Sequence, residues 1–303
     1  MRADDALTVR RVTSPIITLT TDFGSRDGYA AAMKGVILGI HPGATIVDVT
    51  HDVPPQDVAH AAFVLGTTCP YFPPDAVHVA VVDPGVGTKR NLLLLVTPHG
   101  SYVAPDNGVV AYILMAQGAL AKPTTEPMAA EAMLAPVRID VPSGCDAYLL
   151  NRSEYWLGPV SDTFHGRDIF APVAAHLASG VPAKELGEPM DSVVCLSIPQ
   201  PLAMGDVIEG HVIHVDRFGN LVSNIRLEDS AKVGITVEID GATIHGLSSS
   251  YAAGEEPALS LPKGLLAIVG SSGYLEVAAR NASAAQQLGS VVGSRVRVKT
   301  VDA

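Results

Sequence analysis

The chain has 303 residues, 48% of them hydrophobic, which is enough for more than one domain with a substantial core. Its 20 Lys and Arg residues against 31 Asp and Glu residues give a formal net charge of −11 at pH 7. This charge argues against nucleic acid and anionic membrane surfaces as partners, because both need clustered positive charge. A cationic substrate is weakly favoured by the same balance.

Cysteine usage and the N-terminus indicate a cytoplasmic protein. Cys69, Cys145 and Cys195 are widely spaced and odd in number, which favours a reducing compartment. No zinc-binding spacing and no HExxH pair occurs, so we expect no metal site. Residues 1–14 lack the apolar core of a secretory signal, and we expect a flexible tail there. The longest apolar run, residues 109–116, is too short to span a bilayer.

The first part of the chain alternates between strand-like and helix-like segments. Short apolar runs predict strands at 16–20, 45–49, 77–82, 92–96 and 102–103. The spacing of apolar residues predicts helices that begin near Asp27, after Pro54-Pro55 and at Asn107, and a further helix over 168–178. This alternation predicts an α/β domain over residues 15–192, with a mainly parallel sheet covered by helices.

The second part of the chain reads as β structure. The composition changes at about residues 193–205, which we interpret as a linker, and helical periodicity fades beyond it. Short strands are predicted at 207–215, 221–225, 233–239, 242–247, 265–269 and 296–301. Asp240-Gly241 is typical of a two-residue hairpin turn. Residues 206–303 are therefore predicted to form a smaller all-β domain, a sandwich or a barrel.

A carboxylate follows two of the predicted strands, Asp22 after the first and Asp83 after the third. The carboxyl ends of strands are where open α/β sheets place their ligands. Arg90 comes seven positions after Asp83, and its guanidinium could return to the same carboxyl edge of the sheet. The alternative is an ordinary turn with a solvated aspartate and arginine.

Six short motifs occur in a fixed order. They are TTDFG (20–24), VVDPGVGTKR (81–90), APDNG (104–108), TFHGRDIF (163–170), DRFGN (216–220) and SSGYLE (271–276). Each is weak alone, but together they resemble the S-adenosyl-L-methionine (SAM) hydrolases, also called SAM hydroxide adenosyltransferases. These proteins are related to the SAM-dependent fluorinase and chlorinase. The resemblance runs from about Ile16 to about Val298, nearly the whole chain.

The resemblance implies hydrolysis of SAM to adenosine and L-methionine, by displacement at the ribose C5′. SAM is then the substrate, and no cofactor is implied. Asp83, Arg90 and His165 match the Asp-Arg-His set of the family residue by residue, which implies that they jointly hold a water or hydroxide in line with C5′. The resemblance also implies a barrel-like C-terminal domain and a homotrimer whose active sites are shared between subunits.

The residues that the resemblance assigns to substrate binding come from both halves of the chain. Asp22 is implied to accept the two ribose hydroxyls, an arrangement that suits a carboxylate. The full set is Asp22, Asp83, Asp216, Asn220, Ser271, Tyr274 and Glu276. For Asp216 and Asn220 the alternative is a turn between two strands, where Asn and Gly permit positive φ.

Two other functions stay open at this point. A halogenase of the chlorinase kind would need a halide pocket, but Asp83 would repel an anion. A non-catalytic SAM or adenosine sensor would need only the binding residues, and it would have no use for the Asp-Arg-His set. Hydrolysis is therefore the preferred interpretation.

Overall fold

The computed structural model describes residues 15–119, 133–227, 234–251 and 264–300. They form two compact units, residues 15–119 with 138–195 and residues 133–137 with 196–300. The predicted tail, residues 1–14, lies outside the described residues. The stretch interpreted as a linker, residues 193–205, holds most of strand β9 (Ser192–Leu196) and all of β10 (Leu202–Met204), so it is not an unstructured connection.

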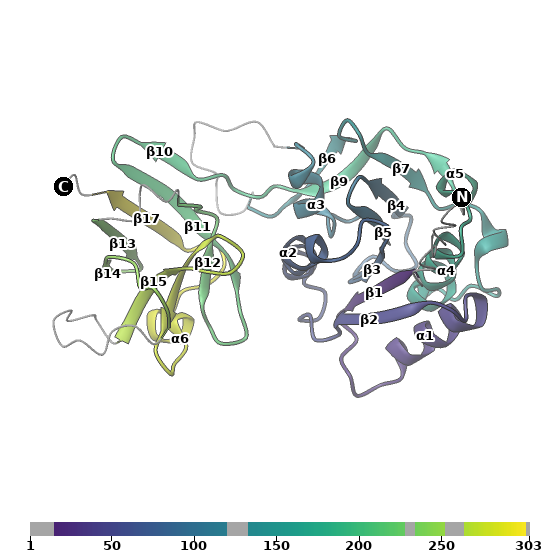
Figure 1. Ribbon diagram of the computed structural model, residues 1–303, viewed down its shortest axis with the longest axis horizontal. Helices are drawn as coiled ribbons and strands as arrows, with labels where there is room; N and C mark the ends of the chain where they lie inside the picture. Colours follow the sequence, from purple (N-terminus) through teal and green to yellow (C-terminus); the bar gives the residue numbers. More distant parts are fainter. Residues whose placement is uncertain (1–14, 120–132, 228–233, 252–263, 301–303) are drawn as a thin grey trace, which may run out of the picture. The chain divides into compact units, whose positions relative to one another are not determined.

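The first unit alternates strands and helices, as predicted (Figure 1). Its elements are β1 (Ile16–Thr21), α1 (Tyr29–Ile40), β2 (Thr45–Thr50), α2 (Val58–Thr68), the 3₁₀ turn η1 (Cys69–Tyr71), β3 (Val77–Val81), β4 (Leu92–Thr97), β5 (Gly100–Pro105), α3 (Ala111–Ala116), β7 (Asp146–Leu149), the 3₁₀ turn η3 (Ser153–Tyr155), the π-helical turn η4 (Gly166–Phe170), α4 (Ala171–Ala178), α5 (Ala183–Leu186) and β8 (Glu188–Pro189). Strands β6 (Pro136–Asp140) and β9 pair with each other and cross the boundary between the units.

The main sheet of this unit is mixed rather than mainly parallel. Its strand order among the described residues is β2-β1-β3-β5-β4-β7-β8. The pairs from β2 to β5 are parallel, and the pairs from β5 to β8 are antiparallel. The reversal follows from the connection between β4 and β5, because Pro98-His99 is far too short for the crossover that a parallel pair needs.

Different helices cover the two faces of the sheet, because side chains alternate along each strand. Ile17 and Val79 pack in one buried cluster with residues of α1 and α4. Helices α2 and α3 contact each other on the opposite face (Figure 1). Helix α2 begins after Asp57, whose Oδ1 accepts the N–H of His60 at 2.8 Å. The helix predicted from Asn107 begins instead at Ala111.

The second unit is antiparallel β structure. Its elements after β10 are β11 (Val207–Val215), β12 (Leu221–Ser223), β13 (Ile235–Ile239), β14 (Ala242–His245), β15 (Leu265–Val269), β16 (Leu275–Ala279), α6 (Ala284–Leu288) and β17 (Arg295–Thr300). The strand order is β14-β13-β17-β11-β12-β16-β15, with β10 beside β11. Asp240 and Gly241 have φ of 41° and 78° and form the predicted hairpin turn between β13 and β14.

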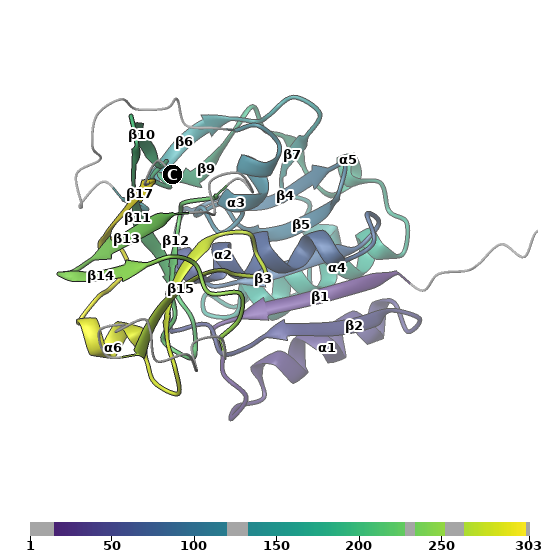
Figure 2. The same ribbon diagram turned by 60° about the vertical axis from the view of Figure 1, so that its left-hand side comes forward.

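This sheet nearly closes on itself. Strands β14 and β15 stand at its two ends, yet they lie side by side (Figure 2). The N–H of Ser248, just beyond β14, donates to the carbonyl of Ala267 in β15 at 2.7 Å. The predicted α/β class with a smaller barrel-like β unit is therefore confirmed. Within the described ranges, no helix is long and apolar enough to cross a bilayer.

A buried histidine lies in β3, on the face that carries α2. The Nδ1 of His78 shares a hydrogen bond of 2.9 Å with the hydroxyl of Thr18. Its ring stacks on Tyr102 and meets the edge of Phe72, and none of its surface is exposed. Burial lowers the pKa of His78 from 6.5 to about 4, because the charged form would lose its hydration.

We predict that His78 makes the free energy of unfolding depend on pH. Below pH 6.5 His78 becomes protonated in the unfolded chain but stays neutral in the folded one. The contribution of His78 to the free energy of unfolding is therefore fully present above pH 6.5 and falls as the pH drops toward 4. The loss reaches at most about 3 kcal/mol. Urea unfolding of the wild type and His78→Asn from pH 7 to pH 4 measures it. Parallel pH profiles of the two proteins would contradict the prediction.

Candidate active site

The loop after β3 folds back on itself. Val82 extends the buried strand by one residue, and Asp83 follows at the sheet edge. The N–H of Val86 donates to the carbonyl of Asp83 at 3.2 Å, and that of Thr88 to the carbonyl of Gly85 at 3.1 Å. These two successive turns return the chain to Arg90, directly before β4, so both ends of the loop lie at one edge.

Arg90 and Asp83 form a bidentate ion pair. The Nε of Arg90 donates to Oδ1 of Asp83 at 2.6 Å, and its Nη2 donates to Oδ2. Only 10% of the arginine side chain and 5% of the aspartate side chain are exposed. Two parallel charge-assisted hydrogen bonds fix the orientation of both side chains. Because both side chains are nearly buried, removing either one would leave the other as a poorly hydrated charge.

His165 joins this pair from a distant part of the chain. Its Nδ1 lies 2.9 Å from Nη2 of Arg90. A guanidinium only donates, so Nδ1 must accept, and the proton of the neutral ring is then on Nε2. Burial and, next, the charge of Arg90 lower the pKa of His165, which keeps the ring neutral near pH 7. The structure thus brings together the three residues of the predicted set.

A buried aspartate holds the segment that carries His165. Oδ2 of Asp168 accepts the N–H and the hydroxyl of Ser161 at 2.9 and 2.7 Å. Its Oδ1 accepts Nε of Arg167 at 2.6 Å. His165 is the residue before the π-helical turn η4, which continues into α4. The helix predicted over 168–178 therefore begins two residues earlier, at Gly166, with a π turn of the kind found at many functional sites.

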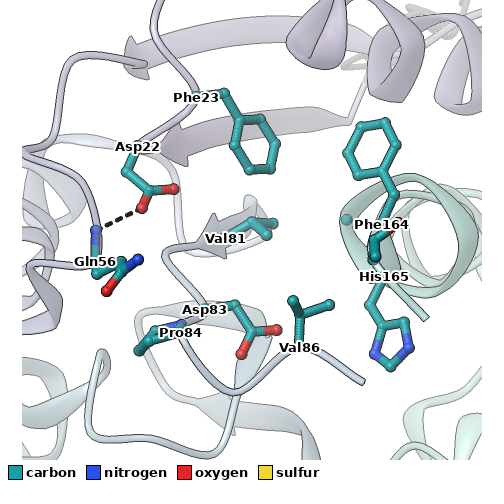
Figure 3. A pocket seen from close by; sticks show the side chains of 11 residues that line it. Asp22, Phe23, Gln56, Val81, Asp83, Pro84, Val86, Phe164 and His165 are labelled. Carbon is teal, nitrogen blue, oxygen red and sulfur yellow. Dashed lines mark hydrogen bonds between the residues drawn. The ribbon is translucent and has the colours of Figure 1, made fainter. Parts of the chain in front are cut away.

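A pocket of about 260 Å³ opens beside these residues (Figure 3). Asp22, Asp83 and His165 line it, while Arg90 touches the last two without lining it. Figure 3 shows Asp22 and Gln56 on one side and Phe164 and His165 on the other. The remaining lining residues are Phe23, Val81, Pro84, Val86, Thr163 and Gly166. All belong to the first unit.

Gln56 is a pocket residue that the sequence did not indicate. Its backbone N–H donates to Oδ2 of Asp22 at 2.7 Å. It adopts φ of 66°, a conformation that costs a non-glycine residue roughly 1–2 kcal/mol. The contact uses one carboxylate oxygen of Asp22 and leaves Oδ1 for a ligand. Because every residue type except proline carries this N–H, no side-chain signal identified it.

In the second unit, Asp216 and Asn220 form a tight turn between β11 and β12. Oδ1 of Asp216 accepts the N–H groups of Phe218 and Asn220 at 2.9 and 2.8 Å, and Oδ2 accepts Nδ2 of Asn220 at 2.8 Å. The turn that we kept as the alternative is present. Contacts of Asp216 and Asn220 with substrate stay a prediction.

The last motif forms the turn between β15 and β16. Ser271 is exposed there, and the ring of Tyr274 lies 3.9 Å from the guanidinium carbon of Arg226. Glu276 is buried in β16 and accepts the hydroxyl of Tyr251 at 2.9 Å. Burial raises the pKa of Glu276, and Asp216 raises it further. Asp216 and Glu276 therefore lie close enough to interact electrostatically.

No group of three His, Cys, Asp or Glu side chains among the described residues is arranged to hold a metal ion. The pocket instead combines carboxylates and one imidazole with aromatic and aliphatic walls. Such a surface suits a small molecule with polar and apolar parts.

Comparison with known proteins gives one consistent family. Residues 17–187 match the model of the SAM hydroxide adenosyltransferase N-terminal domain, and residues 210–297 match that of the C-terminal domain. Proteins named (R)-S-adenosyl-L-methionine hydrolase are similar to the chain. The one from Salinispora arenicola is 37% identical over 94% of this chain and 98% of its own, and the one from Thermus thermophilus is 37% identical over 92% and 97%.

More distant similarity extends in two directions. A fluorinase from Nocardia brasiliensis is 27% identical over 94% of this chain and 97% of its own. The crystal structure of an uncharacterized conserved protein from Thermotoga maritima matches with a TM-score of 0.76 at 29% identity, covering 93% of this chain and 99% of that one.

We predict that two glycines with similar backbones differ in their tolerance of alanine. Gly87 has φ of 75°, and an added Cβ would lie 2.5 Å from the carbonyl oxygen of Asp162. Gly24 has φ of 68°, and an added Cβ would have no atom within 4 Å. Gly24→Ala should lower the free energy of unfolding by about 1–2 kcal/mol, and Gly87→Ala by about 1–3 kcal/mol more. Urea unfolding measures both losses of stability. Equal losses would contradict the close approach of Gly87 to the carbonyl of Asp162.

Proposed function

The chain belongs to the SAM hydroxide adenosyltransferase family, and we propose that it hydrolyses SAM to adenosine and L-methionine. One observation supports this most directly. Arg90 contacts both Asp83 and His165 at the edge of a pocket that Asp22 also lines. These are the residues that a hydrolase of this family would need, and they lie in a chain 37% identical to proteins with that name.

The proposed reaction is an in-line displacement at the ribose C5′. A water or hydroxide attacks C5′, the C5′–S bond breaks, and methionine leaves as a neutral thioether. Because the sulfonium already carries the positive charge, the leaving group needs no acid. The demand on the protein is to hold the oxygen nucleophile in line and to accept its proton, and orientation of this kind supplies several kcal/mol.

The three polar side chains suit that demand in different ways. We assign Asp83 to accept a hydrogen bond from the attacking water, in competition with Arg90. The guanidinium provides a fixed positive charge that favours hydroxide over water. The neutral ring of His165 presents an Nε2–H that can donate to the oxygen nucleophile. A nucleophile placed between the acceptor Asp83 and the donor His165, near the charge of Arg90, is both oriented and made more acidic, and Asp83 is the acceptor toward which its proton moves.

Asp22 is proposed to hold the ribose. Gln56 occupies its Oδ2, so Oδ1 is the oxygen directed to the ribose hydroxyls. Asp216, Asn220, Ser271, Tyr274 and Glu276 are proposed to contact the adenine and methionine parts. The ion pair of Asp83 and the two Asp216 bonds with Asn220 also serve the local structure, so their loss would affect both stability and binding.

Halogenation is the second candidate, since fluorinases are among the relatives. A halide near Asp83 would face a carboxylate that is 5% exposed, and such a charge is screened little by solvent. Arg90 offsets this repulsion for any anion, but water and hydroxide can donate a hydrogen bond to Asp83 and a halide cannot, so water is favoured over halide. A sensor without catalysis remains the third candidate. The homotrimer with shared sites and the lack of a cofactor stay predictions of the resemblance, and the cytoplasmic location stays a prediction from the cysteines and the N-terminal sequence.

We predict that the purified protein converts SAM to adenosine and methionine without added metal. Chromatography of the products distinguishes the three candidates. Chloride or fluoride should change neither the rate nor the product, whereas a halogenase would form a halogenated adenosine. Binding of SAM by calorimetry with no product after long incubation would support the sensor and end the hydrolase proposal.

We predict that Arg90→Lys and His165→Ala each lower kcat by about 10²-fold or more, with a smaller change in KM. Lysine keeps the charge of Arg90 but loses the bidentate geometry and the bond to Nδ1 of His165. Arg152→Ala is the matched control, because Arg152 is a surface arginine of the same unit with one weak ion pair to Glu188 at 3.8 Å. Wild-type kcat in either site variant would remove that residue from the mechanism.

A further inference from the structure

The motif Ala104-Pro105-Asp106-Asn107-Gly108 has no part in the reaction described above. Its first two residues end β5, and Asp106 follows at the sheet edge where Asp22 and Asp83 follow β1 and β3. Because β1, β3 and β5 are parallel, their carboxyl ends meet at this edge. Neither Asp106 nor Asn107 lines the pocket, so any effect on the reaction has to pass through other residues.

Asn107 holds the residue before Asp83. Its Nδ2 donates to the carbonyl of Val82 at 2.9 Å, and its Oδ1 accepts the N–H of Val109 at 3.2 Å. The amide is thus fixed by one donor and one acceptor contact. Val82 is covalently linked to Asp83, so the hydrogen bond from Asn107 to Val82 sets the direction in which the chain leaves the strand.

Asp106 holds the residue after Arg90. Its N–H donates to the carbonyl of Asn91 at 3.1 Å, and its Oδ2 accepts Nδ2 of Asn91 at 3.3 Å. Its Oδ1 accepts the N–H of Val194 at 2.6 Å, which ties the turn to β9. Asp106 is only 5% exposed, so these contacts face little competition from water.

Two adjacent residues therefore hold both ends of the loop that carries the ion pair. We propose that Asp106 and Asn107 are positioning residues for the reaction: by fixing Val82 and Asn91, they set the separation and orientation of Asp83 and Arg90. The inference rests on the proposed function for its effect on rate. Its effect on the contact between Arg90 and His165 does not depend on which reaction the protein catalyses.

The test compares Asn107→Leu with Thr97→Val. Leucine keeps the branched shape of Asn107 and removes both of its bonds. Thr97 lies at the other end of the β4–β5 hairpin, where its hydroxyl donates to the carbonyl of Gly100 at 3.1 Å and accepts the N–H of His99 at 3.1 Å. Thr97→Val thus removes the same pattern of bonds from the same hairpin, far from the ion pair along both strands.

Asn107→Leu should lower kcat for SAM by about tenfold or more, since a misplacement near 1 Å can cost 10²-fold, while KM changes by less than about twofold. Thr97→Val should keep the wild-type kcat. Asn107→Asp keeps the acceptor toward Val109 and loses only the donor toward Val82, and it should also lower kcat. That second variant decides the matter if the leucine variant does not fold.

NMR titration of His165, assigned with His165→Gln, gives a readout independent of turnover. A changed position of Asp83 and Arg90 should shift the pKa of His165 in Asn107→Leu, because Arg90 lowers this pKa and Asp83 raises it, and the pKa should stay unchanged in Thr97→Val. Wild-type kcat together with a wild-type titration of His165 would overturn the inference. Equal losses in both variants, in proportion to stability, would also overturn it. Inactive wild-type protein would instead reject the proposed function, and the titration would still decide this inference.

Discussion

The bidentate ion pair between Arg90 and Asp83 is the interaction on which the site depends. It uses both oxygens of the carboxylate and aims Nη2 of the guanidinium at His165, which fixes the tautomer of the imidazole. A nearly buried charge without its partner costs several kcal/mol. Each element that places Arg90 or Asp83 therefore contributes to stability as well as to the site.

Much of the fold was readable from the chain because burial leaves a pattern in it. The strands predicted at 207–215 and 265–269 coincide with β11 and β15, which contribute buried apolar side chains such as Ile213 and Leu265 to the interior. Strand direction left no such pattern, and the first sheet is half antiparallel because of the short connection at Pro98-His99. Strand β16 was missed, and its first two residues, Leu275 and Glu276, were read only as the end of the SSGYLE motif.

The candidate site was readable where side chains carry the chemistry. Asp22, Asp83, Arg90 and His165 were indicated by residue type and motif order, and the structure places them together around one pocket or in contact with its lining. Gln56 was not indicated, because it acts through a backbone N–H at positive φ. The hydrogen bonds of Asp168 with Ser161 were also missed, because a short-range contact between two polar residues has no distinctive spacing.

The reversal of strand direction at β4 affects what it costs the chain to bring Asp83 and Arg90 together. Leu92, the first residue of β4, pairs with Pro105, the last of β5, so Arg90 precedes β4 at the sheet edge where Asp83 follows β3. In an all-parallel sheet a six-residue strand would begin roughly 20 Å away, at the opposite edge. The reversal makes the ion pair a contact of low sequence separation, seven residues, whose loop-closure entropy is small. His165 is 75 positions from Arg90, so its contact closes a much longer loop and costs more chain entropy than the ion pair does.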